Sequence, residues 1–141
     1  MIRASRPAAT ESILMETNDR FERGLAKLNE IHPDEGRRVI ESLSDIAPDF
    51  ARYLIEFPFG EIYSRDSLDM KSREIAVIAA LTAMGNAAPQ LRSHIIGALN
   101  VGCSKQEIVE VIVQMSVYAG FPAALNGLAI AKDVFAESKK D

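Results

Sequence analysis

The chain has 141 residues, of which 48% are hydrophobic and 26% charged, a composition that is ordinary for a globular protein with a buried core. The net charge is −4 and both signs are mixed along the chain, so no basic stripe indicates a nucleic-acid partner. No apolar run approaches the roughly 20 residues of a bilayer span. Residues 1–12 lack the apolar centre of a secretory signal, so we expect a cytoplasmic protein with no membrane partner.

Cysteine and histidine are scarce in this chain. The one cysteine, Cys103, excludes an internal disulfide and a two-cysteine redox centre within one chain. The two histidines, His32 and His94, lie far apart in the sequence, and neither an HExxH motif nor a Cys/His cluster is present. We therefore expect no metal site. A glycine-rich phosphate loop is absent as well.

Apolar residues recur at helical spacing, and no segment shows the two-residue alternation of a half-buried strand. This pattern predicts an all-α fold of about six or seven helices. We expect a flexible leader at residues 1–10 and a single domain over residues 11–141. The segment 58–60, Pro-Phe-Gly, is expected to end the third helix and to begin a connector. In chain order, the predicted helices are residues 11–31, 34–46, 48–57, 70–84, 89–102, 105–119 and 122–136.

Several helix starts carry recognisable signals. Pro48 and Pro89 suit the first turn of a helix, where a missing N–H does no harm. Asp69 can cap the fourth helix with its side chain. Ser104 and Glu107 have the spacing of a capping box, which places the start of the sixth helix.

The fourth and fifth helices are expected to form a central buried hairpin. Residues 75–84 are apolar almost all the way round, which is typical of a buried helix. Glu74 and His94 lie about ten residues on either side of Met84, so a hairpin would bring them together. A carboxylate beside an imidazole fixes its tautomer and favours the protonated form, which is useful in a proton donor.

Simpler roles exist for the residues of this hairpin. His94 could be a hydrogen-bonded structural histidine, and Glu74 a first-turn acid favoured by the helix dipole. Arg73 and Arg92 could bind a carboxylate in bidentate fashion, or be ordinary surface arginines. Cys103 has no second cysteine to resolve a sulfenic acid, so we favour a structural role for it.

The last two predicted helices are rich in alanine and glycine, which permits close contacts between helices. Together with the apolar helix at residues 75–84, they favour a homo-oligomer, since large apolar faces mark interfaces. A compact monomer is the alternative.

Several motifs occur together in a fixed order: GEIYSR at residues 60–65, LRSHI at 91–95, ALN at 98–100 and YAGFPAALN at 118–126. In this combination the chain resembles the carboxymuconolactone decarboxylase family over about residues 57–137. The resemblance implies an all-α, alkylhydroperoxidase-like fold. It also implies an oligomer, commonly a hexamer built as a trimer of dimers, or a trimer.

The family has two chemical branches. One resembles the alkylhydroperoxidase partner protein, which uses a glutamate, a CxxC pair and a histidine three residues beyond it. With His94 as that histidine, the cysteine positions hold Ala87 and Gln90, so this thiol mechanism is not available.

The other branch resembles the lyase that removes CO2 from 4-carboxymuconolactone in aromatic catabolism, without a cofactor. On this resemblance His94 is the acid or oxyanion donor and Glu74 orients it. A substrate carboxylate or lactone would be held by Arg73 or Arg92, and the pocket lined by Tyr118 and Asn126. Two other functions stay open: a peroxidase that uses Cys103 alone, and a non-catalytic oligomeric protein that binds a small ligand.

Overall fold

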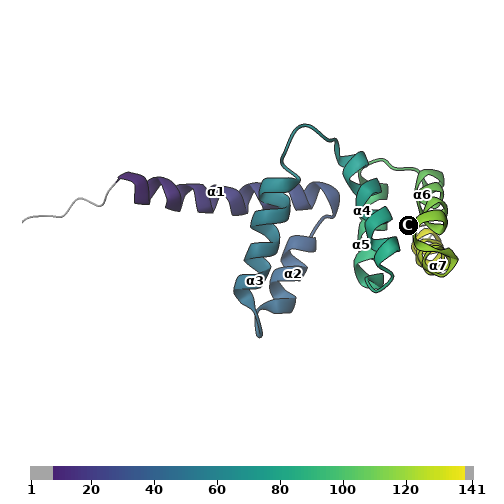
Figure 1. The fold of residues 1–141 in the computed structure, drawn as a ribbon. Helices are drawn as coiled ribbons and strands as arrows, with labels where there is room; N and C mark the ends of the chain where they lie inside the picture. Colours follow the sequence, from purple (N-terminus) through teal and green to yellow (C-terminus); the bar gives the residue numbers. More distant parts are fainter. Residues whose placement is uncertain (1–7, 139–141) are drawn as a thin grey trace, which may run out of the picture. The chain divides into compact units, whose positions relative to one another are not determined.

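The computed structural model describes residues 8–138, with side chains from residue 19 onward. In this part of the chain there are seven α-helices and one π-helix, and no strand, which confirms the all-α prediction. The chain divides into two compact units, Met1–Arg65 and Asp66–Asp141 (Figure 1). The expectation of one domain over residues 11–141 stays a prediction.

The described part of the first unit consists of four helical elements in series, of which α2 and α3 lie side by side (Figure 1). The first helix begins at Ala8, so residues 8–10 of the predicted leader are helical, while residues 1–7 lie outside the described part. Pro48 occupies the first turn of the third helix, as predicted. The elements are α1 (Ala8–Ile31), α2 (Glu35–Leu43), α3 (Pro48–Leu54) and the π-helix η1 (Ile55–Ile62).

The predicted helix end at residues 58–60 is wrong. The helix passes directly from α3 into η1 and includes Pro58. The Tyr63 N–H donates to the Pro58 carbonyl five residues back, at 2.8 Å, which is the π-helical pattern. Proline removes a hydrogen bond and crowds the preceding turn of an α-helix. A wider turn accommodates it, so the chain stays helical where the sequence indicated a break.

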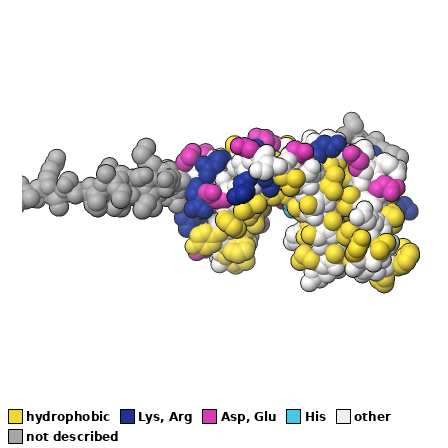
Figure 2. Space-filling view, turned by 45° about the horizontal axis from the view of Figure 1, so that its top comes forward, with side chains coloured by type: hydrophobic (Ala, Val, Ile, Leu, Met, Phe, Trp, Pro, Cys, Tyr) yellow, Lys and Arg dark blue, Asp and Glu magenta, His cyan; other side chains and the backbone are white. Residues whose placement is uncertain are grey.

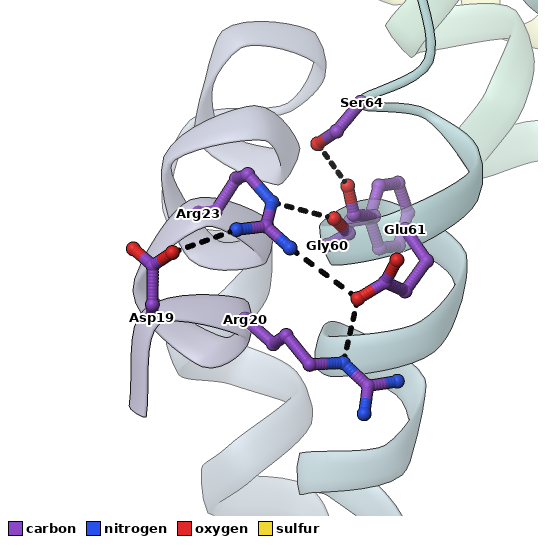
Figure 3. A network of polar contacts seen from close by, with 7 residues as sticks. Asp19, Arg20, Arg23, Gly60, Glu61 and Ser64 are labelled. Carbon is purple, nitrogen blue, oxygen red and sulfur yellow. Dashed lines mark hydrogen bonds and ion pairs between the residues drawn. The ribbon is translucent and has the colours of Figure 1, made fainter. Parts of the chain in front are cut away.

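η1 packs very closely against α1. A β-carbon built on Gly24 of α1 would lie 2.2 Å from the Ile55 carbonyl oxygen, so only glycine permits this approach. The Arg23 side chain crosses the same contact, and its Nε donates to the Gly60 carbonyl at 2.8 Å (Figure 3). Glu61 of η1 pairs with Nη2 of Arg23 at 3.3 Å and with Nε of Arg20 at 2.6 Å. Backbone contact and ion pairs together fix η1 on α1.

The second unit is a bundle of four helices. Their starts follow the predicted signals: the Asp69 side chain accepts from the Ser72 N–H at 2.8 Å, and both hydrogen bonds of the capping box at Ser104 and Glu107 are present. Gly85 ends the first of them in the left-handed region, at φ 73°. The helices are α4 (Met70–Met84), α5 (Ala88–Asn100), α6 (Lys105–Ala119) and α7 (Phe121–Glu137).

Within this unit α4 and α5 fold back on each other as the predicted hairpin, and α6 and α7 pack against them. The burial of α4 is one-sided. Ile78 and Thr82 are buried in the unit, whereas Ala76, Ala80 and Met84 are exposed, so the expected all-round burial is not found within the described chain. The core residues are Ile78, Leu91, Ile95, Ala98, Cys103, Ile108, Ile112, Ala131 and Val134. No helix in the described part is both long and apolar enough to cross a bilayer.

Candidate active site

The hairpin brings Glu74 and His94 into direct contact. The Oε2 atom of Glu74 lies 2.8 Å from Nδ1 of His94, which confirms the predicted contact between α4 and the middle of α5. The Glu74 side chain is fully buried, at 0% exposure, while that of His94 is 26% exposed. Glu74 is therefore enclosed by the protein, while His94 is within reach of a ligand.

The geometry assigns different tasks to the two ring nitrogens of His94. An ionised Glu74 only accepts hydrogen bonds, so Nδ1 must carry the proton that lies between them. Nε2 is then the nitrogen that can give up or take up a proton. The arrangement is suited to general acid–base chemistry at Nε2.

The two candidate arginines are placed on other helix faces. The Arg73 Nε donates to the Leu68 carbonyl at 3.1 Å, and Arg92 forms an ion pair with Glu137. Residues one or two positions apart on a helix do not face each other. Arg73 therefore does not lie on the same face of α4 as Glu74, and Arg92 does not lie on the same face of α5 as His94.

The two residues expected to line the pocket differ in position. Tyr118, near the end of α6, is 79% exposed. Asn126 of α7 lines a cavity of about 120 Å³ in the second unit, together with residues of α4 and α5. The structure thus places Asn126 in a cavity wall and Tyr118 on the surface.

Cys103 is poorly suited to act as a nucleophile. It is buried after the end of α5, and its Sγ lies 3.8 Å from the Lys71 carbonyl oxygen. Burial raises the pKa of the Cys103 thiol above its ordinary value. The thiolate is the reactive form, so this environment opposes the peroxidase chemistry considered above.

Two features were not predicted from the sequence. One is Thr82, a residue in the wall of the same cavity as Asn126, whose hydroxyl is buried without a hydrogen-bond partner among the described residues. The other is a groove of about 690 Å³ in the first unit, where Arg20 and Arg23 lie beside Glu61 (Figure 3). The three-residue spacing of the two arginines on α1 was the available signal. Glu61 and Asp19 offset their charge, and the network holds α1 and η1 together.

The fold and the pair define an all-α protein with a carboxylate–imidazole pair between two helices of one bundle. A sequence model of the carboxymuconolactone decarboxylase family matches residues 48–133. The chain belongs to this family.

Three relatives illustrate its range. The chain is 34% identical to "4-carboxymuconolactone decarboxylase" of Acinetobacter baylyi over 122 residues, which are 86% of this chain and 90% of the relative. It is 26% identical to "Nitrosuccinic acid decarboxylase npaB" of Metarhizium robertsii over 101 residues, which are 69% and 70% of the two chains. It is 29% identical over 99 residues to "Peroxisomal protein 2" of Saccharomyces cerevisiae, covering 70% of this chain and 35% of that protein. The family and the two decarboxylase names support a decarboxylase-like role.

Proposed function

We propose that this protein is a cofactor-independent carboxy-lyase that removes CO2 from a small carboxylated lactone or similar acid in the catabolism of aromatic compounds. The observation that carries the proposal is the pair formed by buried Glu74 and partly exposed His94 at 2.8 Å. The similarity to a 4-carboxymuconolactone decarboxylase along 86% of the chain supports the choice of substrate class. The proposal includes a cytoplasmic location.

The proposed reaction has two requirements that the pair can meet. Loss of CO2 leaves an electron pair that is delocalised onto the lactone as a dienolate, which needs a hydrogen-bond donor at its oxygen. One carbon of this dienolate must then receive a proton. Nε2 of His94 serves as that acid or donor, and Glu74 holds the ring and balances its charge.

Substrate binding is assigned to residues around the hairpin. Arg73 or Arg92 holds a substrate carboxylate, which for Arg92 means exchanging its ion pair with Glu137. Tyr118 and Asn126 contact the rest of the molecule. These roles follow from the family resemblance and are part of the proposal.

The test is a His94→Gln substitution, which keeps a polar side chain but removes the acid. We expect CO2 release from 4-carboxymuconolactone to fall by at least ~100-fold, the lower end for general acid–base catalysis. Glu74→Gln should also lower the rate, because an amide can present its N–H to the ring instead of accepting from Nδ1.

His32→Gln is the matched control, since it removes the other histidine, in the first unit, and should leave the rate unchanged. Circular dichroism establishes that each variant is folded. A His94→Gln enzyme with nearly full activity would contradict the assignment.

The two alternatives give distinct results in the same assays. A peroxidase that depends on Cys103 would consume peroxide and lose this activity in Cys103→Ser. A wild-type protein that neither releases CO2 nor consumes peroxide would favour a non-catalytic role in binding a small ligand.

We also infer that the chain assembles as a homo-oligomer, either a hexamer built as a trimer of dimers or a trimer. Large hydrophobic side chains gather where α6 ends and α7 begins: Val113, Val117, Tyr118, Phe121 and Leu125 are exposed. Figure 2 shows hydrophobic side chains on one face of the second unit. Contiguous exposed patches of this kind mark interaction surfaces. The exposed Ala76 and Ala80 of α4 would permit a close approach of another helix.

A further inference from the structure

His94 has one polar neighbour on the surface of its own helix. Residues three and four positions apart on a helix lie side by side, with about 5–6 Å between their β-carbons. On α5 the four positions around His94 are occupied by Gln90, Leu91, Gly97 and Ala98. Leu91, Gly97 and Ala98 are buried, whereas Gln90 is exposed. Gln90 is thus the one polar side chain of α5 that adjoins His94 and is open to solvent.

Gln90 lies on the solvent side of His94. Four residues of an α-helix make slightly more than one turn, so Gln90 is rotated by about 40° from His94, away from the buried Leu91 and Ile95. Side chains of a helix lean toward its N-terminus, so the His94 ring extends toward the turn that holds Gln90. Nδ1 of the ring is occupied by Glu74, which leaves Nε2 for a ligand. A ligand at Nε2 therefore lies within reach of Gln90.

The Gln90 amide is available for such a ligand. Its side chain has no hydrogen-bond partner among the described residues. Glutamine offers two N–H donors and carries no charge, so it can donate to an anion and does not repel an acidic substrate. Hydrogen-bond donors placed where negative charge develops stabilise a transition state more than the ground state.

The proposed lyase reaction needs a donor and an acid at the same time, and His94 offers only Nε2 for both tasks. We propose that the Gln90 amide donates a hydrogen bond to the lactone oxygen that becomes charged as CO2 leaves, while Nε2 of His94 supplies the proton. This inference rests on the proposed lyase function and assigns its two tasks to two neighbouring side chains.

The step can be followed through its bonds and electrons. The C–C bond to the carboxylate breaks, CO2 leaves, and the electron pair of that bond is delocalised to the lactone oxygen, where Gln90 donates. The electron pair then returns to a carbon of the dienolate, which forms a C–H bond with the proton from Nε2 of His94. Solvent afterwards returns a proton to Nε2.

The experiment measures CO2 release from 4-carboxymuconolactone by the full-length protein at several substrate concentrations and pH values. Gln90→Met has a similar length but no N–H donor. It should lower kcat about 10- to 100-fold, the loss of one hydrogen bond to a charged group, and leave KM nearly unchanged. The pH dependence of kcat should remain that of the wild type, because His94 is intact.

Gln90→Glu separates catalysis from folding. Gln90 lies in the first turn of α5, where the helix dipole favours a negative charge, so this variant should be at least as stable as the wild type. An ionised glutamate only accepts hydrogen bonds and repels the developing charge. Its kcat should therefore fall at least as far as that of Gln90→Met, although its fold is not weakened.

Gln106→Met and Gln106→Glu are the matched controls. Gln106 lies in the first turn of α6, and its amide donates to Glu110 at 3.0 Å. Both controls change a glutamine of a first helical turn away from His94, so both should keep the kcat and KM of the wild type.

Three outcomes would overturn the inference. If His94→Gln abolishes CO2 release but Gln90→Met keeps the wild-type kcat, the lyase function stands and Gln90 has no part in it. If Gln90→Met raises KM and leaves kcat unchanged, the amide only binds the substrate. If the wild type releases no CO2, the proposed function fails and this inference fails with it.

Discussion

Two carboxylates in the second unit have functions in capping helices. The Asp69 side chain accepts from the Ser72 N–H, and this hydrogen bond lowers the pKa of Asp69. The Glu107 carboxylate accepts from the Ser104 N–H at 2.7 Å, which lowers the pKa of Glu107, and Lys71 lies 3.4 Å away. Each carboxylate thus binds its proton less readily in the folded protein than in the unfolded chain.

Glu107→Gln is expected to make the capping box insensitive to acid. Because the pKa of Glu107 is lower in the folded protein, its negative charge stabilises the fold at pH values above the ordinary pKa of 4.5. This stabilisation is lost as the pH falls through the lower pKa of the folded state. Glutamine still accepts the cap hydrogen bond but carries no charge. The variant should therefore be slightly less stable than the wild type near pH 7, and the difference should vanish in acid.

Urea unfolding followed by circular dichroism between pH 7 and pH 3 measures this difference. Glu110→Gln, on the same helix and outside the cap, is the control for the loss of one negative charge from α6. A stability difference for Glu107→Gln that is constant over the whole range would refute the electrostatic explanation.

At the scale of residues, the sequence was informative where spacing carries geometry. Glu74 and His94 were paired correctly because they are equally far from one turn, and a hairpin brings such positions together. Thr82 could not be predicted, because a threonine in an apolar stretch is equally compatible with a bond to its own helix. The placement of Arg92 was also not predictable, since Glu137 is distant in sequence.

The close contact between α1 and η1 depends on a glycine in each. Gly24→Ala would gain helix propensity, but its β-carbon would lie 2.2 Å from a backbone oxygen and 2.9 Å from the Gly60 nitrogen. Backbone atoms cannot move aside as a side chain does. We expect the steric effect to dominate and to destabilise the first unit by about 1–3 kcal/mol.

Chemical unfolding of Gly24→Ala checks this magnitude. Asn29→Ala is the control, because it is an exposed position of α1 where alanine should be neutral or slightly stabilising. If Gly24→Ala were as stable as Asn29→Ala, the close packing of η1 on α1 would not be required.

At the scale of elements, capping signals gave the boundaries well. The starts of α3, α4 and α6 agree with the predictions from Pro48, Asp69 and Ser104. The π-helix was missed because Pro58 and Gly60 are ordinarily helix breakers. Tertiary contacts with α1 compensate for this, and they lie outside any local pattern.

For the whole molecule, the proposed assembly makes a direct prediction about mass. Val117→Glu with Phe121→Glu places two charges in the exposed apolar surface at the junction of α6 and α7. Burying unpaired charges is unfavourable, so the double variant should dissociate into smaller species. Light scattering coupled to size exclusion measures the change.

Gln106→Glu and Gln114→Glu together form the control, since they add the same charge to exposed polar positions of α6. This variant should keep the wild-type mass. A wild type that is monomeric at micromolar concentration would exclude the assembly altogether.

For the whole molecule, the sequence predicted more buried apolar surface than the residues of one chain can cover. The prediction of a helix buried on all sides was only half met, because Ala76 and Ala80 of α4 are exposed. Periodicity shows which faces are apolar, but it does not show whether the cover comes from the same chain.

The enclosed position of Glu74 has a consequence for chemical labelling. Because Nδ1 of His94 faces the buried carboxylate, an electrophile that arrives from solvent can acylate the ring only at Nε2. In a His32→Gln background, such a reagent would mark one imidazole nitrogen per chain. NMR of the labelled ring would then show whether only Nε2 had reacted, as the intact pair requires, with no substrate present.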